Sequence, residues 1–120
     1  RPLYHLACVL ASNHLVTLFH SAQKLLNVSC HGEEFPKEAI LDLMEASVRN
    51  LRNTSPEKAL TGPARRGDTE ALKEHFRNLS QSAPQYSQLY VELLRATKPL
   101  IPDENRGSIE EVIKSVDKSE

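Results

Sequence analysis

Apolar residues recur every three or four positions along most of the chain, and no stretch alternates as a half-buried strand would. The pattern therefore predicts an all-α protein. From Leu3 to Phe19 apolar residues fall on nearly every face of an expected helix that begins at Pro2 and continues to about Asn27. Because a helix that is apolar all round belongs in an interior, we expect it to be the buried axis of a helical bundle.

Each later segment with helical spacing has recognisable boundary residues and one apolar stripe. Proline suits the first turn of a helix, and Ser, Thr or Asp suits the position before it. One helix is expected from Pro36 to Asn53, and a short one from Ser55 to Leu60. Asp68 or Thr69 caps the next helix. A further helix begins at Pro84, and Pro99 and Pro102 end it. The expected apolar stripes are Ile40, Leu43, Met44, Val48 and Leu51; Leu72, Phe76 and Leu79; Tyr86, Leu89, Tyr90, Leu93, Leu94 and Thr97; and Ile109, Val112, Ile113 and Val116. The last stripe either packs on its own chain, which is the default expectation, or contacts a second copy.

The link from Leu60 to Asp68 contains two glycines, a proline and two arginines. The glycines admit φ values that other residues resist, and the proline fixes its own φ. Asp68 is placed to cap the helix that follows. Arg65 and Arg66 are therefore candidates for holding an anion or a carboxylate. The alternative is a helix stop followed by a new helix start. The residues expected to set the turn are Gly62, Pro63 and Gly67.

Length and composition favour one domain. The chain has 120 residues, of which 39% are hydrophobic, enough for a modest core. We expect a helical domain over residues 1–102 and an amphipathic tail helix over residues 103–120. Because the chain begins with Arg1 and helical spacing starts almost at once, we also expect that an N-terminal domain is missing from it.

Charge and cysteine content bear on the cellular setting. The net charge of −1 offers no overall attraction to nucleic acid or an anionic membrane. No apolar run approaches the roughly 20 residues that a bilayer span needs, so we expect no span. Cys8 and Cys30 would lie about 30 Å apart along a helix, too far for a disulfide. These features predict a soluble, cytoplasmic protein with reduced cysteines.

Polar side chains on the opening helix are the main candidates for chemistry, since a polar group in an apolar setting must be hydrogen-bonded or used. At about 100° per residue, His5 and Ser12 share one stripe, with Asn13 beside it. His14 faces the opposite side. Each of these residues, taken alone, is more often a satisfied core residue than a catalyst. His5 stands out because imidazole exchanges protons near neutral pH.

Several kinds of site have no matching pattern in the sequence. There is no His-x-x-x-His pair for a metal, no Gly-x-Ser-x-Gly elbow and no phosphate-cradling P-loop. The Gly-x-Gly-x-x-Gly turn of dinucleotide-binding domains is also missing. We therefore expect no metal site and no binding of a dinucleotide by this chain alone.

Two motifs together resemble a known family. Tyr-His-x-x-x-x-x-Ala-Ser-Asn spans residues 4–13, and Ala-Leu-Thr-Gly-Pro-x-x-Arg-Gly-Asp spans residues 59–68. Residues 2–101 thus resemble the C-terminal helical domain, of unknown function, of Rossmann-like oxidoreductases. Those proteins are similar to ketopantoate reductase, pyrroline-5-carboxylate reductase and 6-phosphogluconate dehydrogenase. The resemblance implies a 6-phosphogluconate dehydrogenase C-terminal-like fold, an N-terminal Rossmann domain as partner, and a homodimer.

The resemblance also implies roles for the candidate residues. His5 takes the place of the lysine general acid of ketopantoate reductase, and Asn13 that of a substrate-binding asparagine about 12 Å along the helix. NADP or NAD on the absent domain would reduce a carbonyl or imine of a small-molecule substrate, with His5 as proton donor. Ser12 and Asn13 would orient that substrate, and Arg65 or Arg66 would pair with its carboxylate. The alternative is a helical interaction or dimerisation module without chemistry.

Overall fold

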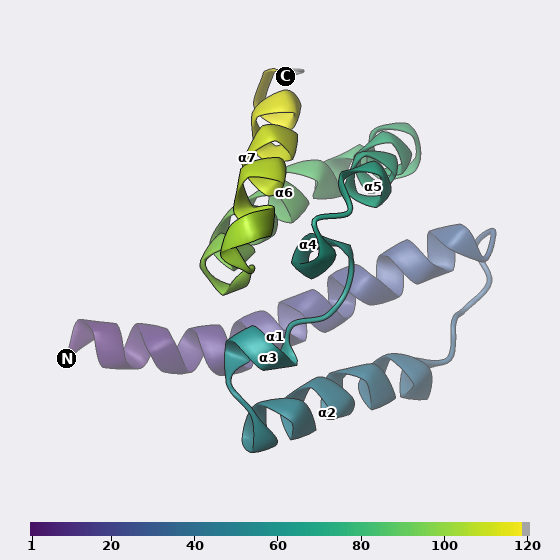
Figure 1. Ribbon diagram of the computed structural model, residues 1–120. Helices are drawn as coiled ribbons and strands as arrows, with labels where there is room; N and C mark the ends of the chain where they lie inside the picture. The colour runs from purple at the N-terminus through teal and green to yellow at the C-terminus, as the bar shows by residue number, and fades with distance from the viewer. Residues whose placement is uncertain (119–120) are drawn as a thin grey trace. The chain divides into compact units, whose positions relative to one another are not determined.

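The computed structural model describes residues 1–118, and within that range all regular structure is helical (Figure 1). The expectation of an all-α fold is confirmed. The α-helices are α1 (Pro2–Ser29), α2 (Lys37–Asn53), α3 (Pro56–Ala59), α4 (Pro63–Arg66), α5 (Thr69–Ser82), α6 (Ser87–Thr97) and α7 (Asp103–Lys118). Two 3₁₀ turns, η1 (Pro84–Tyr86) and η2 (Lys98–Leu100), precede and follow α6.

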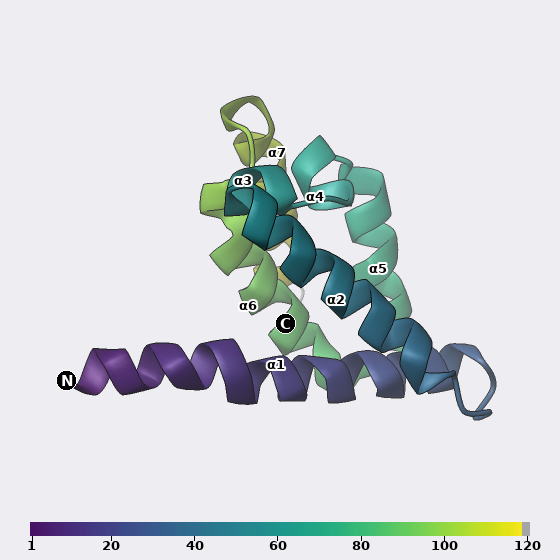
Figure 2. The ribbon, with the colours of Figure 1, turned by 90° about the horizontal axis from the view of Figure 1, so that it is seen from below.

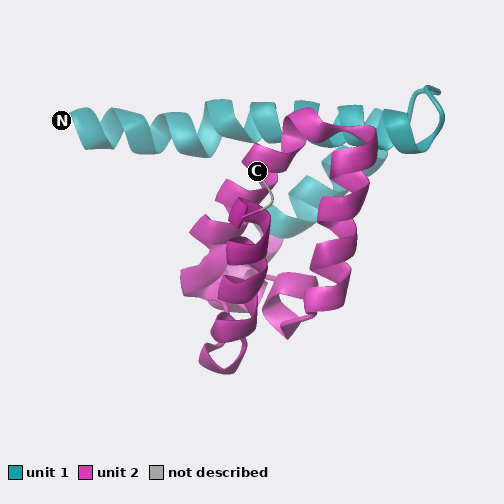
Figure 3. Ribbon diagram, turned by 90° about the horizontal axis from the view of Figure 1, so that it is seen from above, with its two compact units in different colours: residues 1–48 teal, residues 49–120 magenta. Residues whose placement is uncertain are grey.

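The chain forms two compact units, residues 1–48 and residues 49–120 (Figure 3). Helix α7, expected as an amphipathic tail helix that packs on its own chain, packs against α5 and α6 inside the second unit. Packing of its apolar stripe on its own chain is thereby confirmed, with Ile109, Val112 and Ile113 buried.

The first unit contains α1 and α2 as far as Val48, joined by the link of residues 30–36 (Figure 2). At the end of α1 the Gly32 amide donates to the Asn27 carbonyl at 2.8 Å, and the His31 amide donates to the Val28 carbonyl at 3.1 Å. This pair of bonds is a Schellman motif, with His31 in the left-handed region at a φ of 56°. Asn27 Oδ1 also accepts from the Phe35 amide at 2.9 Å. Local hydrogen bonds thus turn the chain from α1 towards α2.

Most apolar side chains of α1 are exposed, so the expectation that this helix is the buried axis of the bundle is wrong. Leu3, Tyr4 and Val16 are 77%, 70% and 68% exposed. The buried residue of α1 is Ser21, whose Oγ donates to the Thr17 carbonyl at 3.0 Å. Apolar residues on all faces of a helix indicate that its surface is buried against something. They do not specify whether the same chain or another surface buries it.

Helix α1 also overturns the expectation that no segment could span a bilayer. Among the described residues, Pro2–Ser29 is the one helix long and apolar enough to cross a membrane. The finding concerns length and composition alone. Core helices of soluble proteins and signal sequences have the same properties.

The second unit is built on a core that α5, α6 and α7 share. Its buried members are Leu72, Phe76, Val91, Leu94, Ile101, Ile109, Val112 and Ile113. Partly buried apolar side chains pack around them, namely Leu60, Ala64, Tyr90 and Val116. Removing a large aliphatic side chain from a core of this kind typically costs about 2–5 kcal/mol. Leu60 and Ala64 belong to the α3–α5 link, so this core holds the link against α5, α6 and α7.

Two of the expected apolar stripes are buried only in part. In α2, Ile40 is buried, whereas Leu43 and Leu51 are exposed. In α6 the most buried side chain is that of Val91, which lies outside the expected stripe, while Leu89 is exposed. Periodicity gives the width of an apolar face, but the neighbouring helices decide which part of it they cover.

Candidate functional site

The three candidate residues of α1 lie on its exposed surface. His5, Ser12 and Asn13 are all exposed, and they follow one another along the helix as expected. Ser12 Oγ donates to the Cys8 carbonyl at 2.6 Å. The Asn13 carbonyl accepts from Thr17 Oγ1 at 3.3 Å. The Ser12 hydroxyl proton is therefore already used within the helix, and its oxygen remains available as an acceptor.

The link between α3 and α5 is a short helix, α4, where the sequence predicted a loop. The Gly67 amide donates to the Ala64 carbonyl at 3.2 Å, and the Asp68 amide donates to the Pro63 carbonyl at 2.9 Å. These bonds form a second Schellman motif, with Gly67 at a φ of 69°. Gly62, before α4, has a φ of 90°. The turn-setting role expected of both glycines is confirmed.

Asp68 also begins the next helix. Its Oδ1 accepts from the Ala71 amide at 3.1 Å, which makes Asp68 the N-cap of α5. One residue thus ends the motif that closes α4 and satisfies an amide of α5. The expected cap is confirmed, and the link has the geometry of a helix stop followed directly by a helix start.

Arg65 is bound to the backbone of its own unit. Its Nη1 donates to the carbonyls of Glu57 and Leu60 at 2.7 and 2.9 Å, and lies 3.3 Å from that of Lys58. A cation near the C-terminal carbonyls of a helix, here α3, is favourably placed. These bonds give Arg65 a structural role, which the sequence alone did not reveal.

Arg66 is placed differently. Its side chain is 63% exposed, and its Nη2 lies 3.9 Å from Asp68 Oδ2. Exposed ion pairs of this length contribute little to stability. Of the two arginines in the link, Arg66 is therefore the one with a guanidinium available to an incoming anion.

The candidate residues fall into two sets that the structure describes separately. His5, Ser12 and Asn13 belong to the first unit, and Arg65 and Arg66 belong to the second. Their joint action on one substrate stays a prediction.

Asn105 is a positioning residue that sequence reasoning missed. Its Nδ2 donates to the Arg65 carbonyl at 2.8 Å, so it ties the start of α7 to the link. The same side chain lies over Gly67, where a Cβ would come within 2.8 Å of Asn105 Oδ1. An Asn near a helix start gives no sequence signal of a partner 40 residues away.

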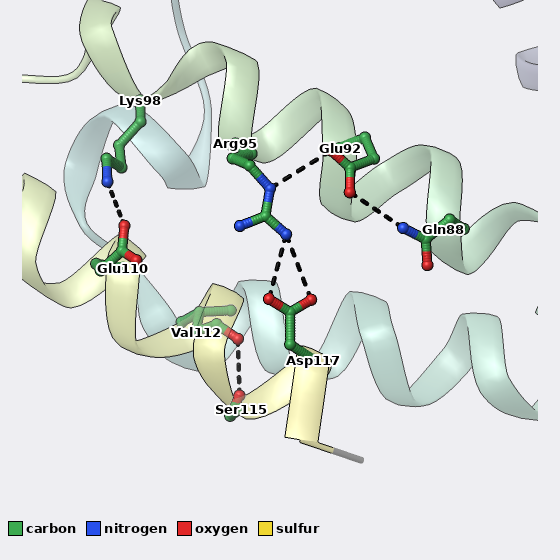
Figure 4. A network of polar contacts seen from close by, with 8 residues as sticks. All are labelled: Gln88, Glu92, Arg95, Lys98, Glu110, Val112, Ser115 and Asp117. Carbon is green, nitrogen blue, oxygen red and sulfur yellow. Dashed lines mark hydrogen bonds and ion pairs between the residues drawn. The ribbon is translucent and has the colours of Figure 1, made fainter. Parts of the chain in front are cut away.

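Charged side chains join α6 to α7 on the surface (Figure 4). Arg95 Nη2 donates to both carboxylate oxygens of Asp117, at 3.3 and 3.2 Å, and Arg95 Nε donates to Glu92 Oε2 at 3.4 Å. The hydrogen bond with Asp117 raises the pKa of Arg95. Lys98 pairs with Glu110, and this hydrogen bond lowers the pKa of the Glu110 carboxyl. Each of these groups has a partner. Glu92, Arg95 and Asp117 are exposed, whereas Lys98 and Glu110 are partly buried, so both clusters link helices at the surface of the unit.

A histidine–tyrosine pair joins α5 to α6. His75 Nδ1 and Tyr90 Oη share a hydrogen bond of 2.7 Å, and the Tyr90 ring lies 5.0 Å from that of Phe76 between centroids. Burial raises the pKa of the Tyr90 phenol. Only the packing of α5 on α6 brings this pair together, so spacing along the chain could not predict it.

Metal-ligating side chains do not gather in the described part of the chain. Residues 1–118 contain no group of three or more His, Cys, Asp or Glu that could hold a metal ion. Cys8 and Cys30 are both free thiols.

Comparison with known proteins identifies a family for this chain. No curated protein and no solved structure matches the chain. Residues 1–97, which include α1 and the whole α3–α5 link, match a family whose description is Domain of unknown function (DUF2520). The chain therefore belongs to the DUF2520 family.

Proposed function

We propose that this chain is the substrate-binding and dimerisation domain of an NAD(P)-dependent oxidoreductase that reduces a carbonyl or an imine. The observation that carries the proposal is the surface of α1, where His5 and Asn13 stand exposed among exposed apolar side chains. Such a surface suits a domain that completes its site with a second domain. The paired motifs at residues 4–13 and 59–68 support the resemblance to ketopantoate reductase-like enzymes.

The dinucleotide belongs to another domain in this proposal. Residues 1–118 contain no strand, and the sequence has no glycine-rich turn for a pyrophosphate. A bound nicotinamide would supply a hydride. The residues of this chain would hold the substrate and deliver the proton.

The three candidate residues of α1 have different tasks in this proposal. The His5 imidazolium donates a proton to the oxyanion or amine that develops as the substrate is reduced. The Asn13 amide orients the substrate as donor and acceptor. Because the Ser12 hydroxyl donates to the Cys8 carbonyl, Ser12 offers the substrate an acceptor oxygen only.

The test uses the enzyme form that includes a dinucleotide-binding domain and follows NADPH oxidation with a panel of keto acids and imines. His5→Gln should lower kcat by about 100-fold or more while KM changes little. His14→Gln, which alters the opposite face of α1, is the matched control and should leave kcat unchanged. Equal rates for His5→Gln and the native enzyme on every substrate that turns over would remove His5 from the mechanism.

Arg66 is the residue we assign to a substrate carboxylate, since Arg65 is already bonded to backbone carbonyls. Arg66→Ala should raise KM for anionic substrates, and Arg66→Lys should restore part of the affinity. If neither substitution changes that affinity, the arginines of the link are structural.

A second candidate function is an association module without chemistry. The structural use of Arg65 and the exposure of Leu3, Leu10 and Val16 favour it. In this case the chain self-associates through α1, and Leu10→Gln combined with Val16→Gln converts the dimer to a monomer in sedimentation. A monomer at every concentration of the native chain would exclude self-association.

A further inference from the structure

A hollow of about 520 Å³ lies within the second unit, bordered by α5, the η1–α6 junction and α7. Its volume falls in the range of small-molecule sites, roughly 300–1,000 Å³. Helix α5 contributes one continuous face, because residues three or four apart are neighbours on a helix. The α5 residues that line the hollow are Lys73, Phe76, Arg77, Ser80 and Gln81.

The lining combines positive charge with an apolar base. Lys73 and Arg77 are the charged residues of the lining, and no carboxylate is among the residues that form it. Phe76 and Val112, both buried members of the core, provide apolar surface. Ser80 adds a hydroxyl. This combination matches a ligand with an anionic end and an apolar end.

Both cations have a glutamate partner on their own helix. Lys73 Nζ lies 3.8 Å from Glu70 Oε1, and Arg77 Nη2 donates a hydrogen bond to Glu74 Oε2 at 2.5 Å. Both pairs join neighbouring turns of α5, and all four side chains are about half exposed or more. Exposed pairs of this kind contribute little to stability, so a ligand anion can replace the glutamates as partner.

We propose that this hollow binds a small organic anion. A carboxylate or phosphate of the ligand pairs with Lys73 and Arg77, and its apolar group lies against Phe76 and Val112. The site uses none of the α1 or α3–α5 link residues in the oxidoreductase proposal, and its test needs no turnover. Either proposal can therefore fail without the other.

The test is an NMR titration of the 120-residue chain with phenyl phosphate and with benzoate. Amide shifts should concentrate at residues 73–87 and 112–116. Whichever of the two compounds binds more tightly identifies the preferred anionic group. Inorganic phosphate and benzyl alcohol, which each carry one half of the ligand chemistry, should bind at least about tenfold more weakly than that compound.

Matched charge variants show whether the proposed cations hold the anion. Lys73→Gln combined with Arg77→Gln should weaken binding by about tenfold or more. Lys114→Gln combined with Lys118→Gln removes the same charge from exposed positions of α7 outside the lining and should change the affinity less than about twofold. All four positions are on the surface, and helical circular dichroism checks that both variants fold. The proposal is overturned if neither aromatic anion shifts these amides, if inorganic phosphate binds as tightly as phenyl phosphate, or if both double variants weaken binding equally.

Discussion

Gly67 is the position in the second unit where one added methyl group should do most harm. Its φ of 69° is left-handed, and a Cβ there would lie 2.8 Å from Asn105 Oδ1 and 2.9 Å from Asn105 Cγ. Asn105 in turn donates to the Arg65 carbonyl at 2.8 Å. Gly67→Ala therefore strains the backbone and displaces the side chain that ties α7 to the α3–α5 link.

The expected magnitude follows from these two effects. A non-glycine residue in the left-handed region costs about 1–2 kcal/mol. Loss of the Asn105 hydrogen bond costs about 0.5–1.5 kcal/mol more. We expect Gly67→Ala to lower the free energy of unfolding by about 1.5–3.5 kcal/mol, a large part of the roughly 5–15 kcal/mol typical of a domain.

Urea unfolding followed by far-ultraviolet circular dichroism measures this loss. Gly107→Ala is the matched control, since nothing lies within 4 Å of its added Cβ, and in the α7 helix it should gain up to about 1 kcal/mol. Asn105→Ala removes the two closest atoms, Oδ1 and Cγ, and leaves the Asn105 Cβ at 3.1 Å, so its combination with Gly67→Ala should cost less than the two single changes together. The reasoning is wrong if Gly67→Ala stays within about 0.5 kcal/mol of the native chain or if the two changes add.

Three other substitutions test the remaining local assignments. His31→Gly should stabilise the first unit by up to about 1 kcal/mol in thermal or urea unfolding. The reason is that His31 has a left-handed backbone just after α1, a conformation that glycine adopts more easily. A loss of stability would contradict the Schellman assignment. Arg65→Ala should cost about 1–2 kcal/mol through the carbonyls it leaves unpaired, whereas Arg66→Ala should stay within about 0.5 kcal/mol; equal effects would refute the distinction. Burial raises the pKa of Tyr90, so the unfolded phenol loses its proton first and stability should fall as the pH rises above about 10. In Tyr90→Phe that alkaline fall should be shallower in pH-dependent urea unfolding, and an unchanged slope would count against the assignment.

The starts of several helices could be predicted because they depend on local chemistry. Pro2 at the first turn of α1, Ser55 before α3 and Asp68 before α5 all stand where the sequence places a helix start. The Ser55 and Asp68 side chains each accept a backbone amide three residues later, a contact that needs no distant partner. The apolar stripe of α5 was also predicted from spacing, and the structure buries all three of its members, Leu72, Phe76 and Leu79.

The candidate site could be predicted only in part. Spacing along a helix sufficed to place His5, Ser12 and Asn13 in order on α1. It could not show that Arg65 binds the carbonyls of Glu57 and Leu60, because that requires the folded link. Nor could it reveal the hollow beside α5, whose lining comes from segments up to about 40 residues apart.

The sequence by itself determined where α1, α3 and α5 begin, and it determined the turn geometry at Gly62 and Gly67, since capping bonds and backbone preferences act within a few residues. Only the tertiary structure decided which apolar faces are covered. It buried Val91 and left Leu3 and Val16 of the apolar α1 exposed. It also set Asn105 over Gly67 and Tyr90 beside His75. Burial and contacts between distant residues depend on which surfaces meet, and hydrophobic burial has no directional preference that a local pattern could encode.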